Sequence, residues 1–193
     1  MGRAPPAKRS SDARFVTAAV LVFSGPIGAG KTHLARAVAD SLGWACVGFS
    51  DEVRRVAASR RLGDDRTTLA EVGALLVRDE PNAFCRAVLA RGGWTPGQPI
   101  VIHGLRHISI LSEMNAIVAP LTVKHIHVQV PPEVRTDRLR RRGESEVATL
   151  DAHSTERDVV EMLPRLADLV VDGAAPVRTN AARVVDWLRG DFP

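Results

Sequence analysis

Short apolar runs alternate along the chain with longer segments in which apolar residues recur every three or four positions. The short runs have the length of buried strands and are bounded by polar, glycine or proline residues. They occupy residues 15–23, 44–49, 99–104, 123–130 and 168–171. This alternation predicts an α/β protein, a doubly wound parallel sheet of five strands with helices on both faces.

The segments between these runs carry apolar stripes with the spacing of amphipathic helices. A helix is also expected from Asp51, and another over residues 131–143, where proline opens it. Gly43 is expected to end the first helix, whereas Pro164 should kink or shorten a helix that begins near Ser154. The stripes are Leu34, Val38 and Leu42; Leu69, Val72 and Leu76; Phe84 and Val88; Ile110, Met114 and Ile117; Val159, Leu163 and Leu166; and Ala181, Val184, Val185 and Leu188.

The chain length of 193 residues suits one compact domain, which we expect to span residues 15–190. Residues 1–14 are polar and basic and lack the apolar core of a secretory signal, so a disordered tail is expected there. Residues 144–153 are polar without periodicity, which predicts a mobile loop acting as a small lid. No apolar run approaches the roughly 18 residues of a membrane span, and no membrane association is expected.

The composition narrows the classes of partner. Hydrophobic residues make up 45% of the chain and charged residues 25%, which argues against disorder in its bulk. The net charge of +4 comes almost entirely from arginine and suits phosphate-bearing ligands. The chain has no tyrosine and therefore few aromatic side chains that could stack on bases, which argues against nucleic-acid binding. Cys46 and Cys85 match neither a zinc spacing nor a disulfide framework, so a location in the reducing cytoplasm is expected. The protein is expected to be a monomer or a homodimer.

The stretch GPIGAGKT fits the pattern GxxxxGK[ST] and lies between a predicted strand and a predicted helix. Glycines there allow a tight loop whose N–H groups point at phosphate oxygens, and the helix adds its positive N-terminal end. Lys31 is expected to reach the β and γ phosphates and Thr32 to ligate Mg²⁺. The sequence therefore predicts binding of ATP and Mg²⁺ through Gly25, Ile27, Gly28, Ala29, Gly30, Lys31, Thr32 and His33.

Two observations restrict the class of nucleotide-binding protein. None of the three lysines is preceded by asparagine, so the Asn-Lys-x-Asp base reader of a typical GTPase is missing. The chain is also too short for a typical AAA machine with a lid subdomain. A small kinase remains, in which a second substrate is held in line with the γ phosphate.

Asp51 and Arg54 follow the second predicted strand with the spacing Asp-x-x-Arg. Because the carboxyl ends of parallel strands line the ligand crevice, both side chains are expected to face the acceptor. The alternative is structural: Asp51 caps the helix that begins there, and Arg54 is solvated. Asp51 is our candidate for a catalytic carboxylate.

Five stretches in this order and approximate spacing resemble nucleoside monophosphate kinase-like proteins, including dephospho-CoA kinases and adenylate-kinase-like proteins. The stretches are GPIGAGKT, which is called the P-loop below, SDEVRR, VIHGLR, PPEVRTDRLRRRG and ADLVVDG. The resemblance implies the sheet order 2-3-1-4-5. It also implies acceptor clamps at Arg54 and Arg106, binding of the transferring phosphoryl group by Arg138 and Arg142, and a loop beside the nucleotide base at Asp172 and Gly173.

His103 departs from this family pattern, which has a carboxylate after the third strand. A neutral imidazole can accept a hydrogen bond from a Mg²⁺-bound water, but it supplies no negative charge. Asp51 is then expected to carry more of that role. His125 and His127 alternate along the fourth predicted strand, but without a cysteine or carboxylate signature they give only weak support to a zinc site.

The leading prediction is an ATP-dependent small-molecule kinase that phosphorylates a nucleoside monophosphate or a similar phosphate. Arg54 and Arg106 favour that acceptor, since a phosphate is already ionised and needs clamps more than a base. Asp51 permits a hydroxyl acceptor, as in dephospho-CoA kinases. A third alternative, motivated by His103, is a nucleotide-binding regulatory protein that hydrolyses ATP weakly or not at all.

Overall fold

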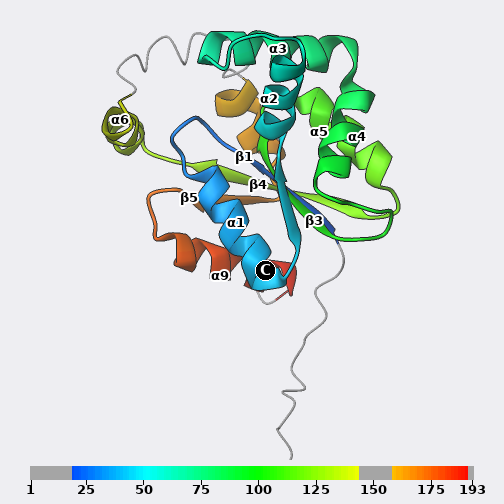
Figure 1. The fold of residues 1–193 in the computed structure, drawn as a ribbon. Helices are drawn as coiled ribbons and strands as arrows, with labels where there is room; N and C mark the ends of the chain where they lie inside the picture. Colours follow the sequence, from blue (N-terminus) through cyan, green and yellow to red (C-terminus); the bar gives the residue numbers. More distant parts are fainter. Residues whose placement is uncertain (1–18, 144–157, 191–193) are drawn as a thin grey trace, which may run out of the picture.

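The computed structural model describes residues 19–143 and 158–190 (Figure 1). The tail expected at residues 1–14 and the loop and lid expected at residues 144–153 lie outside these ranges. Within the described ranges, no helix combines the length and the hydrophobicity that crossing a bilayer requires.

The centre of the molecule is a parallel sheet of five strands with the order β2-β3-β1-β4-β5. The predicted fold class and strand order are therefore confirmed. β1 lies in the middle, so its carboxyl end has neighbours on both sides. The strands are β1 (Ala19–Ser24), β2 (Ala45–Gly48), β3 (Ile100–Leu105), β4 (Thr122–Gln129) and β5 (Leu169–Asp172).

The helices follow the predicted stripes, with two corrections, at the second strand and around Pro164. The backbone leaves the extended conformation at Gly48, so β2 is shorter than predicted and its helix starts at Phe49 instead of Asp51. The predicted helix around Pro164 is a π-helical turn, η1 (Asp158–Met162), followed by a 3₁₀ turn, η2 (Leu163–Leu166). The α-helices are α1 (Lys31–Leu42), α2 (Phe49–Ser59), α3 (Arg66–Asp79), α4 (Pro81–Arg91), α5 (Ile108–Val118), α6 (Pro132–Arg141) and α9 (Val177–Leu188).

Two apolar cores lie on opposite faces of the sheet, because successive side chains of a strand alternate between its faces. Val20 and Val22 of β1 point into the larger core, which packs against α2 to α5 and the two turns η1 and η2. Leu21 and Phe23 point into the smaller core, which packs against α1 and α9. Figure 1 shows α1 and α9 together on one face of the sheet. This arrangement leaves the carboxyl ends of β1, β2 and β3 side by side.

A buried carboxylate ties α2 to the end of α4. The side chain of Glu52 is only 3% exposed and accepts hydrogen bonds from Arg55 at 2.6 Å and from Arg91 at 3.1 Å. The bonds from Arg55 lower the pKa of Glu52 below its ordinary value, the bond from Arg91 adds to this, and burial opposes both. Because the carboxylate form is favoured in the folded state, Glu52 stabilises the protein only while it is ionised.

We expect the Glu52→Gln variant to lose about 1 to 3 kcal/mol of unfolding free energy at neutral pH, since two charge-assisted pairings are weakened. A lowered folded pKa means that the contribution is present above the unfolded value of about 4.3 and is lost as the pH falls through the folded value. Urea unfolding between neutral and acidic pH should therefore show the two proteins converging at low pH. The exposed Glu71→Gln variant is the control, and a gap independent of pH would contradict the assignment.

Candidate functional site

In the P-loop, between β1 and α1, three residues have positive φ angles, which only glycine adopts without strain. Gly25, Gly28 and Gly30 have φ values of 141°, 85° and 96°. Side chains with a Cβ are disfavoured at such angles. Gly30 is also the N-cap of α1, which begins at Lys31. The positive end of this helix and the loop amides therefore lie at the same place.

β4 and α6 hold the loop from the side. A Cβ added to Gly25 would collide with the carbonyl group of Val128, and one added to Gly28 would lie 3.2 Å from the side chain of Leu139. The guanidinium of Arg135, which is 9% exposed, donates a hydrogen bond of 2.8 Å to the carbonyl oxygen of Ile27. Our sequence analysis missed Arg135. The available signal was its position four residues before Leu139, on the buried face of α6.

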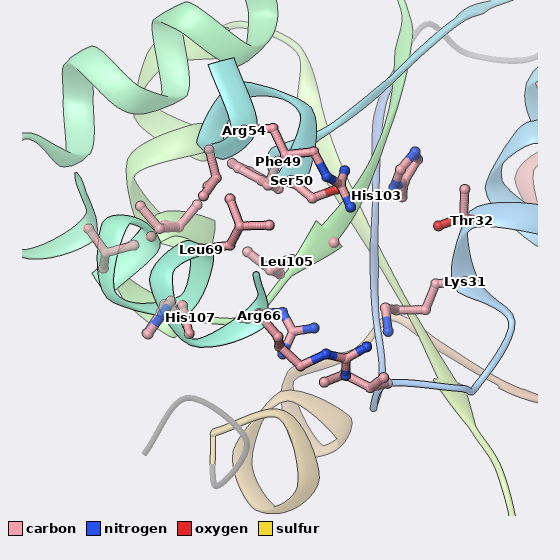
Figure 2. Close-up of a pocket in the computed structure, with 18 of the residues that line it drawn as sticks. Lys31, Thr32, Phe49, Ser50, Arg54, Arg66, Leu69, His103, Leu105 and His107 are labelled. Atoms are coloured by element: carbon pink, nitrogen blue, oxygen red, sulfur yellow. The ribbon is translucent and has the colours of Figure 1, made fainter. Parts of the chain in front are cut away.

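Lys31 and Thr32 are half-buried at the start of α1. The ammonium group of Lys31 lies over the loop and donates a hydrogen bond of 2.7 Å to the carbonyl oxygen of Pro26. The Thr32 side chain lines the same cleft, on the same side as Lys31 (Figure 2). An ammonium group beside a hydroxyl group is the pair that binds the phosphates and the metal of a magnesium nucleotide in P-loop enzymes.

One cleft of about 780 Å³ brings together most of the predicted site residues. Its walls include the loop and the start of α1, together with Arg54 from α2 and Arg106, which directly follows β3. Arg142, just after α6, lines the cleft as well. The predicted residues on its walls are Ile27, Gly28, Gly30, Lys31, Thr32, His33, Arg54, Arg106 and Arg142.

The residues present suit a Mg²⁺ ion that is held mainly by its nucleotide. Magnesium keeps several waters and commonly takes only one or two protein ligands besides phosphate oxygens. Thr32 offers one hydroxyl on the cleft wall. Among residues 19–143 and 158–190, no three His, Cys, Asp or Glu side chains are grouped to hold a metal, so no zinc-type cage competes with this arrangement.

Asp51 occupies the capping position that we weighed as the structural alternative. Its carboxylate accepts a hydrogen bond of 3.1 Å from the N–H of Gly48, at the start of α2. Its other oxygen lies 3.6 Å from a guanidinium nitrogen of Arg54, and both side chains are about half exposed. Asp51 does not line the cleft, whereas Arg54 does. A catalytic role for Asp51 stays a prediction.

His103 is buried at the end of β3 and yet lines the cleft, with 6% of its surface exposed. Its ring lies over Gly48, where a Cβ would come within 3.0 Å of its Nδ1 atom. Figure 2 shows the ring on the cleft wall, in this view between Arg54 and Thr32. Burial lowers the pKa of His103 below its ordinary value; Asp51 opposes this, and Arg36 and Lys31 act with burial. The imidazole is therefore neutral near pH 7.

We expect His103→Asp to leave magnesium-dependent activity unchanged or lower. The new carboxylate would be buried close to Asp51, and two such charges repel. Thermal or urea unfolding should show a loss of about 1 to 3 kcal/mol. His103→Asn, which is neutral, controls for the loss of the ring. A large gain in activity would instead identify the natural protein as an attenuated enzyme.

A second hollow of about 330 Å³ lies on the other side of the loop and holds Ala29, Arg138 and Gly173. The Arg138 guanidinium donates hydrogen bonds to the carbonyl oxygens of Gly173 at 2.8 Å and Ala29 at 3.3 Å. It thus braces the loop against the end of β5. Asp172 closes the turn after β5 by accepting a bond of 2.8 Å from the N–H of Ala174. Gly25, Asp51 and Asp172 line neither hollow.

A buried chain of hydrogen bonds beside the loop is a further feature that our sequence analysis missed. Ser24 Oγ lies 2.6 Å from Nε2 of His125 and 2.8 Å from Nδ1 of His127. Because Nδ1 of His125 faces the carbonyl oxygen of Leu166 at 3.2 Å, we assign its proton to Nδ1. Burial lowers the pKa of His127 to about 4, helped by His125 and Lys31. The His-x-His spacing signalled that both rings share one face of β4.

Residues 21–159 match a protein family whose model is described as AAA domain. No curated protein sequence matches the chain. Several solved structures share its fold. Shikimate kinase from Acinetobacter baumannii, in complex with shikimate, has a TM-score of 0.64 at 14% identity, over 92% of this chain and 96% of that chain.

Two further kinases resemble the chain to a similar degree. APS kinase from Mycobacterium tuberculosis, in complex with AMPPNP and APS, has a TM-score of 0.59 at 15% identity, over 89% of this chain and 98% of that chain. A gluconokinase from Sinorhizobium meliloti has a TM-score of 0.54 at 16% identity, over 92% of this chain and 99% of that chain. These similarities show that the fold is that of P-loop kinases.

Proposed function

The chain belongs to the AAA domain family, and its fold is that of P-loop kinases. On these two premises we propose that it is an ATP- and Mg²⁺-dependent kinase of small molecules. The proposed acceptor is a nucleoside monophosphate or a similar phosphate. One observation carries the proposal: a single cleft is lined both by the loop with Lys31 and Thr32 and by Arg54 and Arg106. A donor site and an anion clamp that share one cleft suit phosphoryl transfer between two bound substrates.

In this proposal each side chain has a separate task. The loop amides and the N-terminal end of α1 hold the β and γ phosphates of ATP, and Lys31 moves from Pro26 to the transferring group. Arg54 and Arg106 hold the acceptor phosphate, and Arg142, which lines the same cleft, binds the transferring phosphoryl group. Thr32 would hold Mg²⁺, which would neutralise charge on the phosphates. Arg138 positions the loop through its hydrogen bonds to the carbonyl oxygens of Ala29 and Gly173.

A hydroxyl acceptor is a second candidate, which the position of His103 favours. Its neutral, buried imidazole lines the cleft on which Lys31 and Arg54 also lie. Such a ring can act as a general base and accept the proton of a hydroxyl nucleophile. A phosphate acceptor is already ionised and needs no base. The two candidates differ in their product, which is a phosphoanhydride from a phosphate and a phosphate ester from a hydroxyl.

A screen with γ-labelled ATP tests the proposal. Ribo- and deoxynucleoside monophosphates and dephospho-CoA are offered in turn, with the Lys31→Ala variant as the blank. We expect acid-labile, anhydride-type label on a monophosphate; acid-stable label would select the hydroxyl candidate. If no acceptor is labelled above the blank while calorimetry shows ATP binding, the chain is a nucleotide-binding regulatory protein instead.

A further inference from the structure

The half of the large cleft that faces away from the P-loop has an apolar floor. We call it the acceptor half; it lies between α2, α3, the end of β3 and the start of α5. Figure 2 shows Phe49, Leu69 and Leu105 together in this half, opposite Lys31 and Thr32. The side chains of its floor are Phe49, Val53, Leu69, Val77, Leu105 and Ile110.

The floor is continuous with the larger core and is held in place by it. Phe49, Leu105 and Ile110 are 5%, 1% and 2% exposed, and each packs into that core. The ring of Phe49 lies against that of Phe84, with centroids 5.5 Å apart and planes inclined at 53°. Side chains packed in this way are held in place, so the floor that they form stays apolar.

The acceptor half offers few neutral groups for hydrogen bonding. Among its described lining residues there is no Asn, Gln, Thr or Tyr, and Ser50 is the one hydroxyl. The other polar side chains are Asp64, the imidazoles of His103 and His107, and three arginines at 54, 66 and 106. Each hydroxyl of a bound ligand that loses water without gaining a partner costs about 1 to 3 kcal/mol. Hydroxyl groups of a ligand are therefore disfavoured where they would lie over the apolar floor, whereas an anion beside the arginines is favoured.

We propose that the acceptor is a phosphate whose body is apolar and poor in hydroxyl groups, with the phosphate on the arginines and the body on the floor. Simple sugar phosphates and sugar acids, which have no apolar body to lie on the floor, are disfavoured by the same chemistry. The inference rests on the proposed function in one respect: this half of the cleft receives the acceptor.

Direct binding tests the inference without requiring catalysis. The full chain, saturated with ADP and Mg²⁺ so that the P-loop is occupied, is titrated by calorimetry with phenyl phosphate, ribose 5-phosphate and inorganic phosphate. Burial of the phenyl ring should make phenyl phosphate bind about tenfold or more tightly than the other two. Equal affinities would show an anion site only, and tighter binding of ribose 5-phosphate would overturn the inference.

Two leucines of α3 provide a matched pair of variants. Leu69 and Leu75 are both half-buried, but only Leu69 lines the cleft. Leu69→Asn should abolish most of the preference for phenyl phosphate, and Leu75→Asn should keep it. If Leu69→Asn does not fold, Leu69→Ala makes the same test, since it shortens the floor without adding a polar group. A preference that survives both Leu69 variants contradicts the location.

The outcomes separate this inference from the proposed function. A protein that prefers phenyl phosphate but labels no acceptor from ATP keeps the apolar acceptor site and loses the kinase proposal. A protein that labels a sugar phosphate efficiently keeps the kinase proposal and loses the apolar acceptor site.

Discussion

The Lys31→Ala variant is expected to lower the rate of phosphoryl transfer by about 10² to 10³-fold, which is the usual effect of removing one preorganised group that stabilises transition-state charge. In the structure the ammonium group of Lys31 donates a hydrogen bond to the carbonyl oxygen of Pro26, in the loop that we propose holds the phosphates. Its loss should leave the fold intact, because the side chain belongs to neither apolar core. Turnover of labelled ATP with the identified acceptor measures the effect.

Lys124→Ala is the matched control, since Lys124 is the other lysine among the described residues. Its ammonium lies 5.7 Å from the ring centroid of Trp187, away from both hollows. Removing this cation–π contact should cost about 0.5 to 1 kcal/mol of stability and leave turnover unchanged. Equal turnover by the Lys31→Ala variant and the natural protein would show that the P-loop is not the site of transfer.

Gly25→Ala is expected to cause the largest loss of stability, more than about 3 kcal/mol, because two independent faults coincide there. The backbone of Gly25 has a φ of 141°, which residues with a Cβ avoid. The added methyl group would also meet the carbonyl group and the Cβ of Val128 on the adjacent strand. Neither neighbour is the end of a flexible side chain, so the loop itself must move. Urea unfolding measures the loss, and calorimetry should show weakened nucleotide binding.

Gly43→Ala separates the two faults. Gly43 also has a positive φ, of 68°, but nothing lies within 4 Å of an added Cβ. Its variant should lose only about 1 to 2 kcal/mol, the cost of the left-handed backbone alone. Similar losses in both variants would mean that the contact between Gly25 and Val128 is unimportant.

The P-loop was predictable because all of its determinants are local. A buried strand, a run of glycines and a helix with Lys31 and Thr32 in its first turn follow one another without interruption. The strand order was also correct, although it came from a resemblance and not from the periodicity of the chain. Nothing in the local pattern says which strands are neighbours.

The acceptor side was predictable only in part. Arg54 and Arg106 are far apart in the sequence, and they reach one cleft because β2 and β3 are neighbours with parallel directions. The same sequence reasoning placed Asp51 in the cleft, whereas the structure uses it to cap α2. A carboxylate at the third position of a helix has both options, and its local sequence does not decide between them.

Arg138 and Arg142 show the same limit. Their spacing of four residues places them on one face of a helix, but α6 ends at Arg141. Arg142 therefore lies on the walls of both hollows, while Arg138 reaches the carbonyl oxygens of the loop and of Gly173. Which of two neighbouring arginines meets a ligand depends on where the helix ends and on what lies opposite.

The sequence by itself determined the class of fold, the phosphate loop and the identity of the residues that can bind anions, because periodicity and glycine spacing act over a few neighbouring positions. The tertiary structure decided which of those residues share a cleft. It also placed Gly48 beneath the ring of His103, Val128 beside Gly25, and an apolar floor in one half of the cleft. These contacts join residues that are distant along the chain, and they depend on strand register and helix packing, which no short stretch of sequence contains.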